Sequence, residues 1–262
     1  MTETTPLDTA HAAMEAAPED AAARLRFYER LADSELFLAL DGAPGGDQIA
    51  PRIFPVEDQR FVLVFDREER LADFAEGSAP YAVLSGRGLA AMLAGQGIGL
   101  AVNPGALSSI LIPADAVDWL AATLSEAPEE VEERPEEITA PTGLPEVLLA
   151  ALDTKLATAR GLARFAYLCG VSYAGGRRSH LLAFVDPVPG AEPALARAAG
   201  EALTFSGVAA GMMDVGFFRA SDPVAAKLAR AGLRFDLPKP ERSGRTPGSA
   251  PGMDPESPPR LR

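Results

Sequence analysis

The stretch from Ile53 to Trp119 constrains the fold most, because short apolar strands alternate in it with short amphipathic helices. Pro, Gly or Asn stands at nearly every junction, as in the turn Asn103–Gly105, where each residue type suits a tight change of direction. The strand predicted at Arg60–Phe65 is apolar on both faces, which is typical of a central strand. The agreement between these local signals predicts one folded unit of sheet and helices.

The same patterns extend to both sides and predict an α+β protein of two small domains, each a mixed β-sheet packed with helices. Asp66 and Glu69 form a pair that predicts the capped start of a helix after the central strand. The predicted organisation is a disordered arm (1–16), an α+β domain (17–124), an acidic Glu/Pro linker (125–142), a second α+β domain (143–238) and a disordered tail (239–262).

Charge is spread unevenly along the chain. Residues 1–141 hold 26 acidic and 9 basic side chains (−17), residues 142–262 hold 11 and 15 (+4), and the two sums give the net −13. An acidic first half repels phosphate backbones, so we expect no nucleic acid among the partners. No signal peptide and no membrane-spanning run of apolar residues is recognisable, so we expect a cytoplasmic protein without a membrane partner.

The turn Gly86–Ala91 carries the sharpest hint of ligand binding. Gly86, Gly88 and Ala91 fit the pattern G-x-G-x-x-A, after a predicted strand and at the start of a helix, as in dinucleotide-binding folds. The acidic residue that binds the ribose about 20 residues later is missing. A tight strand–helix turn explains the glycines equally well, so cofactor binding here is the alternative interpretation and no cofactor is predicted.

Residues for nucleophilic or metal chemistry are scarce. Cys169 is the single cysteine, and the two histidines are His11, in the predicted arm, and His180, in a strand beside the strand of Cys169. A Cys169–His180 pair requires an exposed thiol of low pKa, whereas a cysteine in an apolar strand is typical of an inert core. We therefore predict no catalytic residue and no metal site. Arg177 and Arg178 at a hairpin tip are too few for an RNA footprint.

Two passages, FPVEDQRFVLVFDREERLADF and LAAMLAGQGIGLAVNPG, with the apolar strand and helix that follow, resemble the N-terminal domain of the SseB family of bacterial proteins. Residues 144–238 are similar to the C-terminal domain that accompanies it. The resemblance implies two α+β domains. It implies no catalytic residues, because the family, named for enhanced serine sensitivity, has none established. The expected function is a non-enzymatic protein-interaction or regulatory module whose partner is another protein, in an oligomeric state that the sequence leaves open.

Overall fold

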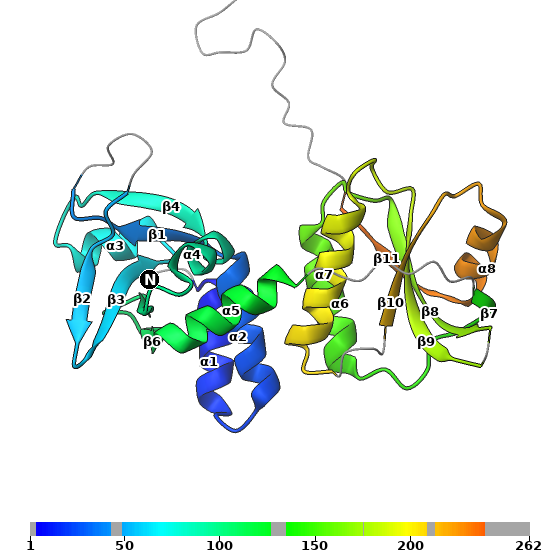
Figure 1. Cartoon of the computed structure of the whole chain (residues 1–262), viewed down its shortest axis with the longest axis horizontal. Helices are drawn as coiled ribbons and strands as arrows, with labels where there is room; N and C mark the ends of the chain where they lie inside the picture. The colour runs from blue at the N-terminus through cyan, green and yellow to red at the C-terminus, as the bar shows by residue number, and fades with distance from the viewer. Residues whose placement is uncertain (1–3, 43–48, 127–134, 175, 209–212, 239–262) are drawn as a thin grey trace, which may run out of the picture.

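A computed structural model of the chain describes residues 4–42, 49–126, 135–174, 176–208 and 213–238. It contains helices and two mixed sheets, which confirms the α+β class. We call residues 4–126 the N-terminal unit and residues 135–238 the C-terminal unit, each built on one of the sheets (Figure 1). The predicted division into two domains with the boundaries given above stays a prediction.

The N-terminal unit has a six-stranded sheet in the order β4-β1-β3-β5-β6, with β2 also paired to β3. Its elements are α1 (Pro6–Ala16), α2 (Ala21–Asp33), β1 (Glu35–Ala39), β2 (Ile53–Val56), β3 (Gln59–Phe65), α3 (Glu68–Phe74), β4 (Tyr81–Ser85), α4 (Gly86–Leu93), β5 (Ile98–Val102), β6 (Ile110–Ile112) and α5 (Ala114–Ser125). Only β3 and β5 run parallel. Residues 61–65 of β3 are buried, so the prediction of a central strand with two covered faces is confirmed.

The two faces of this sheet are covered unequally. Helices α1, α2, α4 and α5 build the main core on one face, with Phe27, Leu31 and Leu89 fully buried. The other face carries a smaller aromatic cluster in which Phe61 and Phe65 pack with Leu71 of the short helix α3. The alternation of side chains along each strand supplies both clusters from the same residue runs.

The C-terminal unit has a five-stranded sheet in the order β10-β9-β8-β11, with β7 also paired to β8. Its elements are β7 (Pro135–Thr139), α6 (Glu146–Thr158), β8 (Phe165–Tyr173), β9 (Arg178–Val185), α7 (Glu192–Phe205), β10 (Met213–Phe218), α8 (Pro223–Ala231) and β11 (Leu233–Asp236). The predicted hairpin is present as β8 and β9, which pair antiparallel. Helices α6 and α7 lie on the side of the sheet that faces the N-terminal unit (Figure 1).

Three local predictions are wrong. The arm predicted as disordered is helical at Pro6–Ala16, because Thr5 caps the helix, a proline stands at its start and Leu7 is buried against the core. The predicted linker contributes strand β7 at Pro135–Thr139, while residues 127–134 and the tail 239–262 lie outside the described residues. Asp66 does not cap α3, whose first cap position is Arg67 without a side-chain hydrogen bond.

Candidate functional site

The turn at Gly86 is a packing site. A Cβ atom at Gly86 would stand 1.8 Å from the backbone oxygen of Leu31, so only glycine lets α2 approach this closely. The Gly86 amide donates to the backbone oxygen of Ser34, and the Gly88 amide donates to Oγ of Ser85, which caps α4. These contacts use two of the amides that a pyrophosphate would need. Close helix packing therefore accounts for the glycine pattern, and the binding role of Gly86, Gly88 and Ala91 stays a prediction.

Cys169 and His180 lie on opposite faces of the second sheet. Cys169 pairs with Leu181 across β8 and β9, whereas His180 pairs with Gly170, one position away, and neighbouring residues of a strand point to opposite sides. The Cys169 thiol is completely buried, and this burial raises its pKa to about 11. The His180 ring bonds instead to the backbone oxygen of Thr142. The two side chains are not arranged for nucleophilic catalysis.

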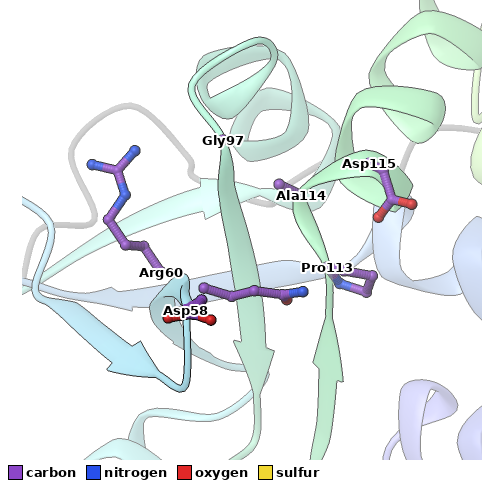
Figure 2. A pocket seen from close by; sticks show the side chains of 7 residues that line it. Asp58, Arg60, Gly97, Pro113, Ala114 and Asp115 are labelled. Carbon is purple, nitrogen blue, oxygen red and sulfur yellow. The ribbon is translucent and has the colours of Figure 1, made fainter.

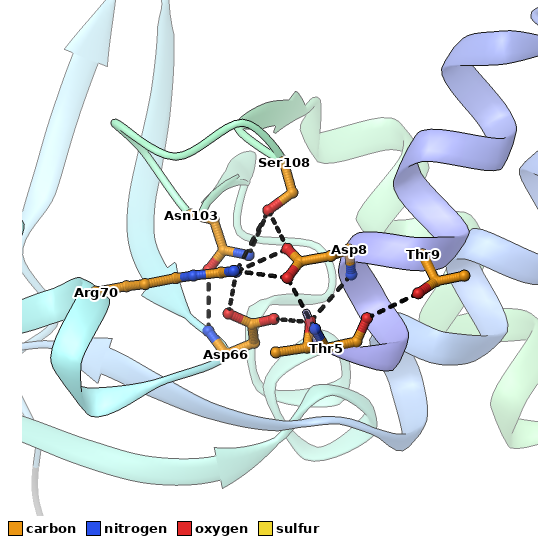
Figure 3. Close-up of polar contacts among 7 residues, drawn as sticks. All are labelled: Thr5, Asp8, Thr9, Asp66, Arg70, Asn103 and Ser108. Carbon is orange, nitrogen blue, oxygen red and sulfur yellow. Dashed lines mark hydrogen bonds and ion pairs between the residues drawn. The ribbon is translucent and has the colours of Figure 1, made fainter. Parts of the chain in front are cut away.

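The carboxyl ends of the parallel strands β3 and β5 hold a polar network (Figure 3). In open α/β sheets this edge is the usual place for a ligand. Here helix α1 covers it: both terminal nitrogens of Arg70 donate to the carboxylate of Asp8, at 2.8 and 2.6 Å, and Arg70 also donates to Asp66 at 2.7 Å. Oγ of Ser108 donates to Asp8 at 2.6 Å, and Thr5 donates to Asp66 at 2.6 Å. The network attaches α1 to the sheet.

Acid should weaken this attachment. Burial alone would raise the pKa of Asp8, but hydrogen bonds from Arg70, Ser108 and the Thr5 backbone outweigh it and hold that pKa well below its ordinary value. A carboxyl group with a lowered folded-state pKa stabilises the fold above its unfolded pKa, near 4, and loses that contribution as the pH falls further. The contribution is thus complete at neutral pH and declines below about pH 4.

We expect Asp8→Asn to lower the free energy of unfolding by about 1–3 kcal/mol at pH 7, because charge-assisted bonds in a partly buried site are lost. The difference from the native chain should shrink as the pH is lowered from 5 to 2, because in this range the unfolded native chain takes up a proton at Asp8 while the folded state keeps the carboxylate ionised. Urea denaturation at several pH values measures both. Asp153→Asn, at an exposed position of α6, is the matched control and should change little. A constant difference at every pH would contradict the assignment.

A second charged cluster joins the two units. Lys155 of α6, only 2% exposed, places its Nζ 2.6 Å from Asp33 of α2 and 2.7 Å from Glu201 of α7. Arg87 of α4 bonds to both oxygens of Glu201, at 2.9 and 3.1 Å, and to Asp33 at 2.6 Å. Oε1 of the buried Glu29 lies 3.7 Å from the Lys155 ammonium. Three carboxylates and two cations therefore meet where α2 and α4 contact α6 and α7.

The electrostatics of this cluster follow from burial and pairing. Burial would raise the pKa of Asp33 and of Glu201, but the nearby Lys155 and Arg87 lower both below their ordinary values. Glu29 is the exception: burial raises its pKa, and its Oε1 accepts no hydrogen bond within the described part of the chain. Among those residues no group of His, Cys, Asp and Glu is placed to hold a metal ion. The cluster holds the units together and offers no open coordination site.

Both clusters were missed from sequence, although each carries a signal. Thr5 and Asp8 have the spacing of a capping box, with Pro6 at the first helical position. Lys155 falls on the buried stripe of α6 between Leu152 and Leu156, where a lysine is unexpected unless it is paired. The residues next to each signal do not show which distant carboxylates complete the cluster.

Two surface hollows of similar size lie on the N-terminal unit. One, of about 330 Å³, lies beside the start of β5 and is lined by Asp58, Gln59, Arg60, Gly97, Pro113, Ala114 and Asp115. Figure 2 shows that its charged side chains do not converge on a common point. The Arg60 guanidinium is already bonded to the backbone oxygen of Gln96 at 2.9 Å. This hollow lacks the convergent polar groups of a small-molecule site.

The other hollow, of about 370 Å³, is a groove between two helices. It is lined by Arg24, Leu25, Tyr28, Asp115, Ala116 and Trp119, and we call it the α2–α5 groove. Trp119 is 40% exposed, and its ring meets that of Tyr28 edge to face, with centroids 5.3 Å apart. On its other side Trp119 contacts Phe205 of α7, so the groove adjoins the contact between the units. An exposed tryptophan next to a half-buried tyrosine and an arginine is typical of protein-binding surfaces.

Comparison with known proteins identifies the N-terminal unit. Residues 10–119 match the family model of the SseB protein N-terminal domain. The match begins within α1, ends within α5 and includes every strand of the first sheet. No curated protein and no solved structure matches the chain. No helix within the described residues is both long and apolar enough to cross a membrane. Residues 10–119 thus carry an SseB protein N-terminal domain, and this domain supports membership of the SseB family.

Proposed function

We propose that this SseB-family protein is a non-enzymatic interaction module of the cytoplasm, which binds another protein through the α2–α5 groove. The observation that carries the proposal is Trp119, which the fold leaves 40% exposed next to Tyr28 although the same helix buries Val117 and Leu120. A large aromatic ring at the surface contributes binding energy when a partner excludes water from it.

Charge indicates what kind of partner the groove suits. The groove belongs to the half of the sequence with net charge −17, and Asp115 and Arg24 both line it. Opposite charge accelerates encounter and aligns the partner, while the desolvated aromatic centre supplies affinity. The partner we propose is therefore a protein segment that combines basic residues with an apolar anchor.

The arrangement of the other candidate groups also favours binding over catalysis. Cys169 and His180 are on opposite faces of a sheet, and the glycines at 86 and 88 serve packing and capping. The edge at which α/β sheets bind small ligands is covered by α1 and its network with Arg70. The α2–α5 groove combines a concave shape with an aromatic pair, Tyr28 and Trp119.

Quantitative affinity purification of three tagged chains tests the proposal. We expect a partner that is captured by the native chain to be lost from Trp119→Ala and retained by Phe74→Ala, a matched control because Phe74 is an aromatic residue of 41% exposure on another surface. The purified partner should then bind the native chain at least about tenfold more tightly than Trp119→Ala, the size of effect expected for an aromatic anchor. Equal binding to both variants would overturn the role of the groove.

A further inference from the structure

We infer that the α2–α5 groove is occupied by the chain's own residues 239–262, with the Pro258-Pro259-Arg260 segment against Tyr28 and Trp119. This inference rests on the proposed function, because it uses the same groove and names the chemistry that the groove recognises. The tail would then compete with the partner protein and make binding conditional on its release.

The tail has the composition that an aromatic groove recognises. Residues 239–262 include six prolines and carry five basic and three acidic side chains. Proline-rich segments favour an extended left-handed helix that loses little entropy on binding, and aromatic-lined grooves recognise it. Ser257-Pro258-Pro259-Arg260 places two consecutive prolines directly before a basic residue. No other part of the printed sequence has two adjacent prolines followed by an arginine.

The groove offers complementary groups for each part of that segment. The edge-to-face rings of Tyr28 and Trp119 provide an apolar surface for the two prolines. Asp115, which lines the same groove, provides a carboxylate for Arg260. Arg24, also in the lining, provides a cation for the acidic residue Glu256 on the other side of the prolines. A charged pair on each side would set the direction in which the segment lies.

The attachment point of the tail makes this docking possible within one chain. The last described residue, Pro238, accepts a hydrogen bond from the Gly161 amide at 2.9 Å and so belongs to the C-terminal unit. Helix α7 of the same unit places Phe205 against Trp119, with ring centroids 6.3 Å apart. The 19 residues from Lys239 to Ser257 span up to about 60 Å at about 3.1 Å per residue when extended. That reach exceeds the width of a small domain.

Because the tail and the α2–α5 groove belong to one chain, the tail can occupy the groove even if its intrinsic affinity is weak. A short flexible tether presents its end at an effective concentration of about 1 mM, so a segment with an intrinsic Kd of about 0.1 mM would be docked about ten times as often as released. Replacing the recognition residues should therefore raise the fraction of chains with an open groove about tenfold.

The chain has a single tryptophan, Trp119, so the test is direct: selectively excited tryptophan emission reports on this one residue of the groove. We compare the full chain with the triple variant Pro258→Ala, Pro259→Ala, Arg260→Glu by emission maximum and acrylamide quenching. We expect a red shift and stronger quenching in the variant.

The matched control, Pro247→Ala, Pro251→Ala, Arg245→Glu, changes the tail's composition equally and should behave as the native chain. A synthetic peptide of residues 250–262 should reverse the red shift of the test variant, and Asp115→Lys should prevent that reversal.

Each outcome decides the inference. Identical fluorescence of the native chain and both variants, with no response to the peptide, would overturn it. Protection that increases with protein concentration would also overturn it, since it would show a second copy on the groove. If the fluorescence shows no docking of the tail but a partner protein still requires Trp119 for binding, this inference is refuted and the proposed function is not. Loss of partner binding by Trp119→Ala concerns the proposed function, and fluorescence of the tail variants does not depend on that result.

Discussion

Gly86→Ala is expected to destabilise the protein by about 3 kcal/mol or more, because the added methyl group has no space. Its Cβ would stand 1.8 Å from the backbone oxygen and 2.7 Å from the backbone carbon of Leu31, and neither atom can rotate away as a flexible side chain would. Relief requires α2 and α4 to separate, which would disturb the main core around Leu31 and Leu89. Urea denaturation measures the loss.

Gly88→Ala is the matched control within the same turn. Its Cβ would lie 3.1 Å from Oγ of Ser85, a side-chain atom, and alanine gains about 1 kcal/mol of helix propensity over glycine in compensation. We expect the stability of this variant to stay within about 1 kcal/mol of the native value.

The same pair of variants discriminates between the two interpretations of the glycine pattern. A dinucleotide site needs both glycines, whereas packing needs Gly86 alone. If saturating NAD or another nucleotide raises the melting temperature of the native chain and Gly88→Ala removes that shift, the turn binds a ligand and the packing interpretation is incomplete.

Lys155→Met is expected to cost about 3–5 kcal/mol at pH 7, since it removes the buried ammonium between the carboxylates and leaves Asp33 and Glu201 with Arg87 as their shared cation. Asp33 and Glu201 lie 2.6 and 2.7 Å from the Lys155 ammonium, and Glu29 lies beside it at 3.7 Å. Thermal and urea denaturation measure the loss. The exposed Lys227→Met is the matched control and should stay within about 0.5 kcal/mol of the native chain.

The loss in Lys155→Met should also depend on pH in a defined direction. Without the lysine, burial and mutual repulsion raise the folded-state pKa values of the carboxylates above those of the unfolded chain. The folded state then binds more protons, so the variant should regain stability as the pH falls from 8 towards 5. A triple variant with Asp33→Asn and Glu201→Gln added should recover part of the loss at pH 7. A cost of Lys155→Met that is small and independent of pH would show that water enters the cluster.

Much of the fold could be predicted because its signals are local. The unbroken apolar run Phe61–Phe65 predicts a strand with two apolar faces, and the turn residues around Asn103 separate two strands, so the central strand and its neighbours were located correctly. Asn103 does adopt a positive φ of 49°, as an Asn in such a turn can. The helix at Pro6–Ala16 was missed because Ala-rich sequence has weak periodicity, and burial of Leu7 by the distant core stabilises it.

The sequence by itself determined the class of fold, the central strand with its neighbours, the SseB N-terminal domain at residues 10–119 and the scarcity of nucleophilic groups, since each of these depends on residue types and their spacing along the chain. Only the tertiary structure decided which polar groups meet. Arg70 and Asp8 are 62 residues apart, Arg87 and Glu201 are 114 apart, and Lys155 and Asp33 are 122 apart. Local patterns carry no information on such pairs, because packing of the helices and sheets brings them together. The exposure of Trp119 has the same origin: the packing of α5 buries Val117 and Leu120 and leaves Trp119 of the same helix 40% exposed.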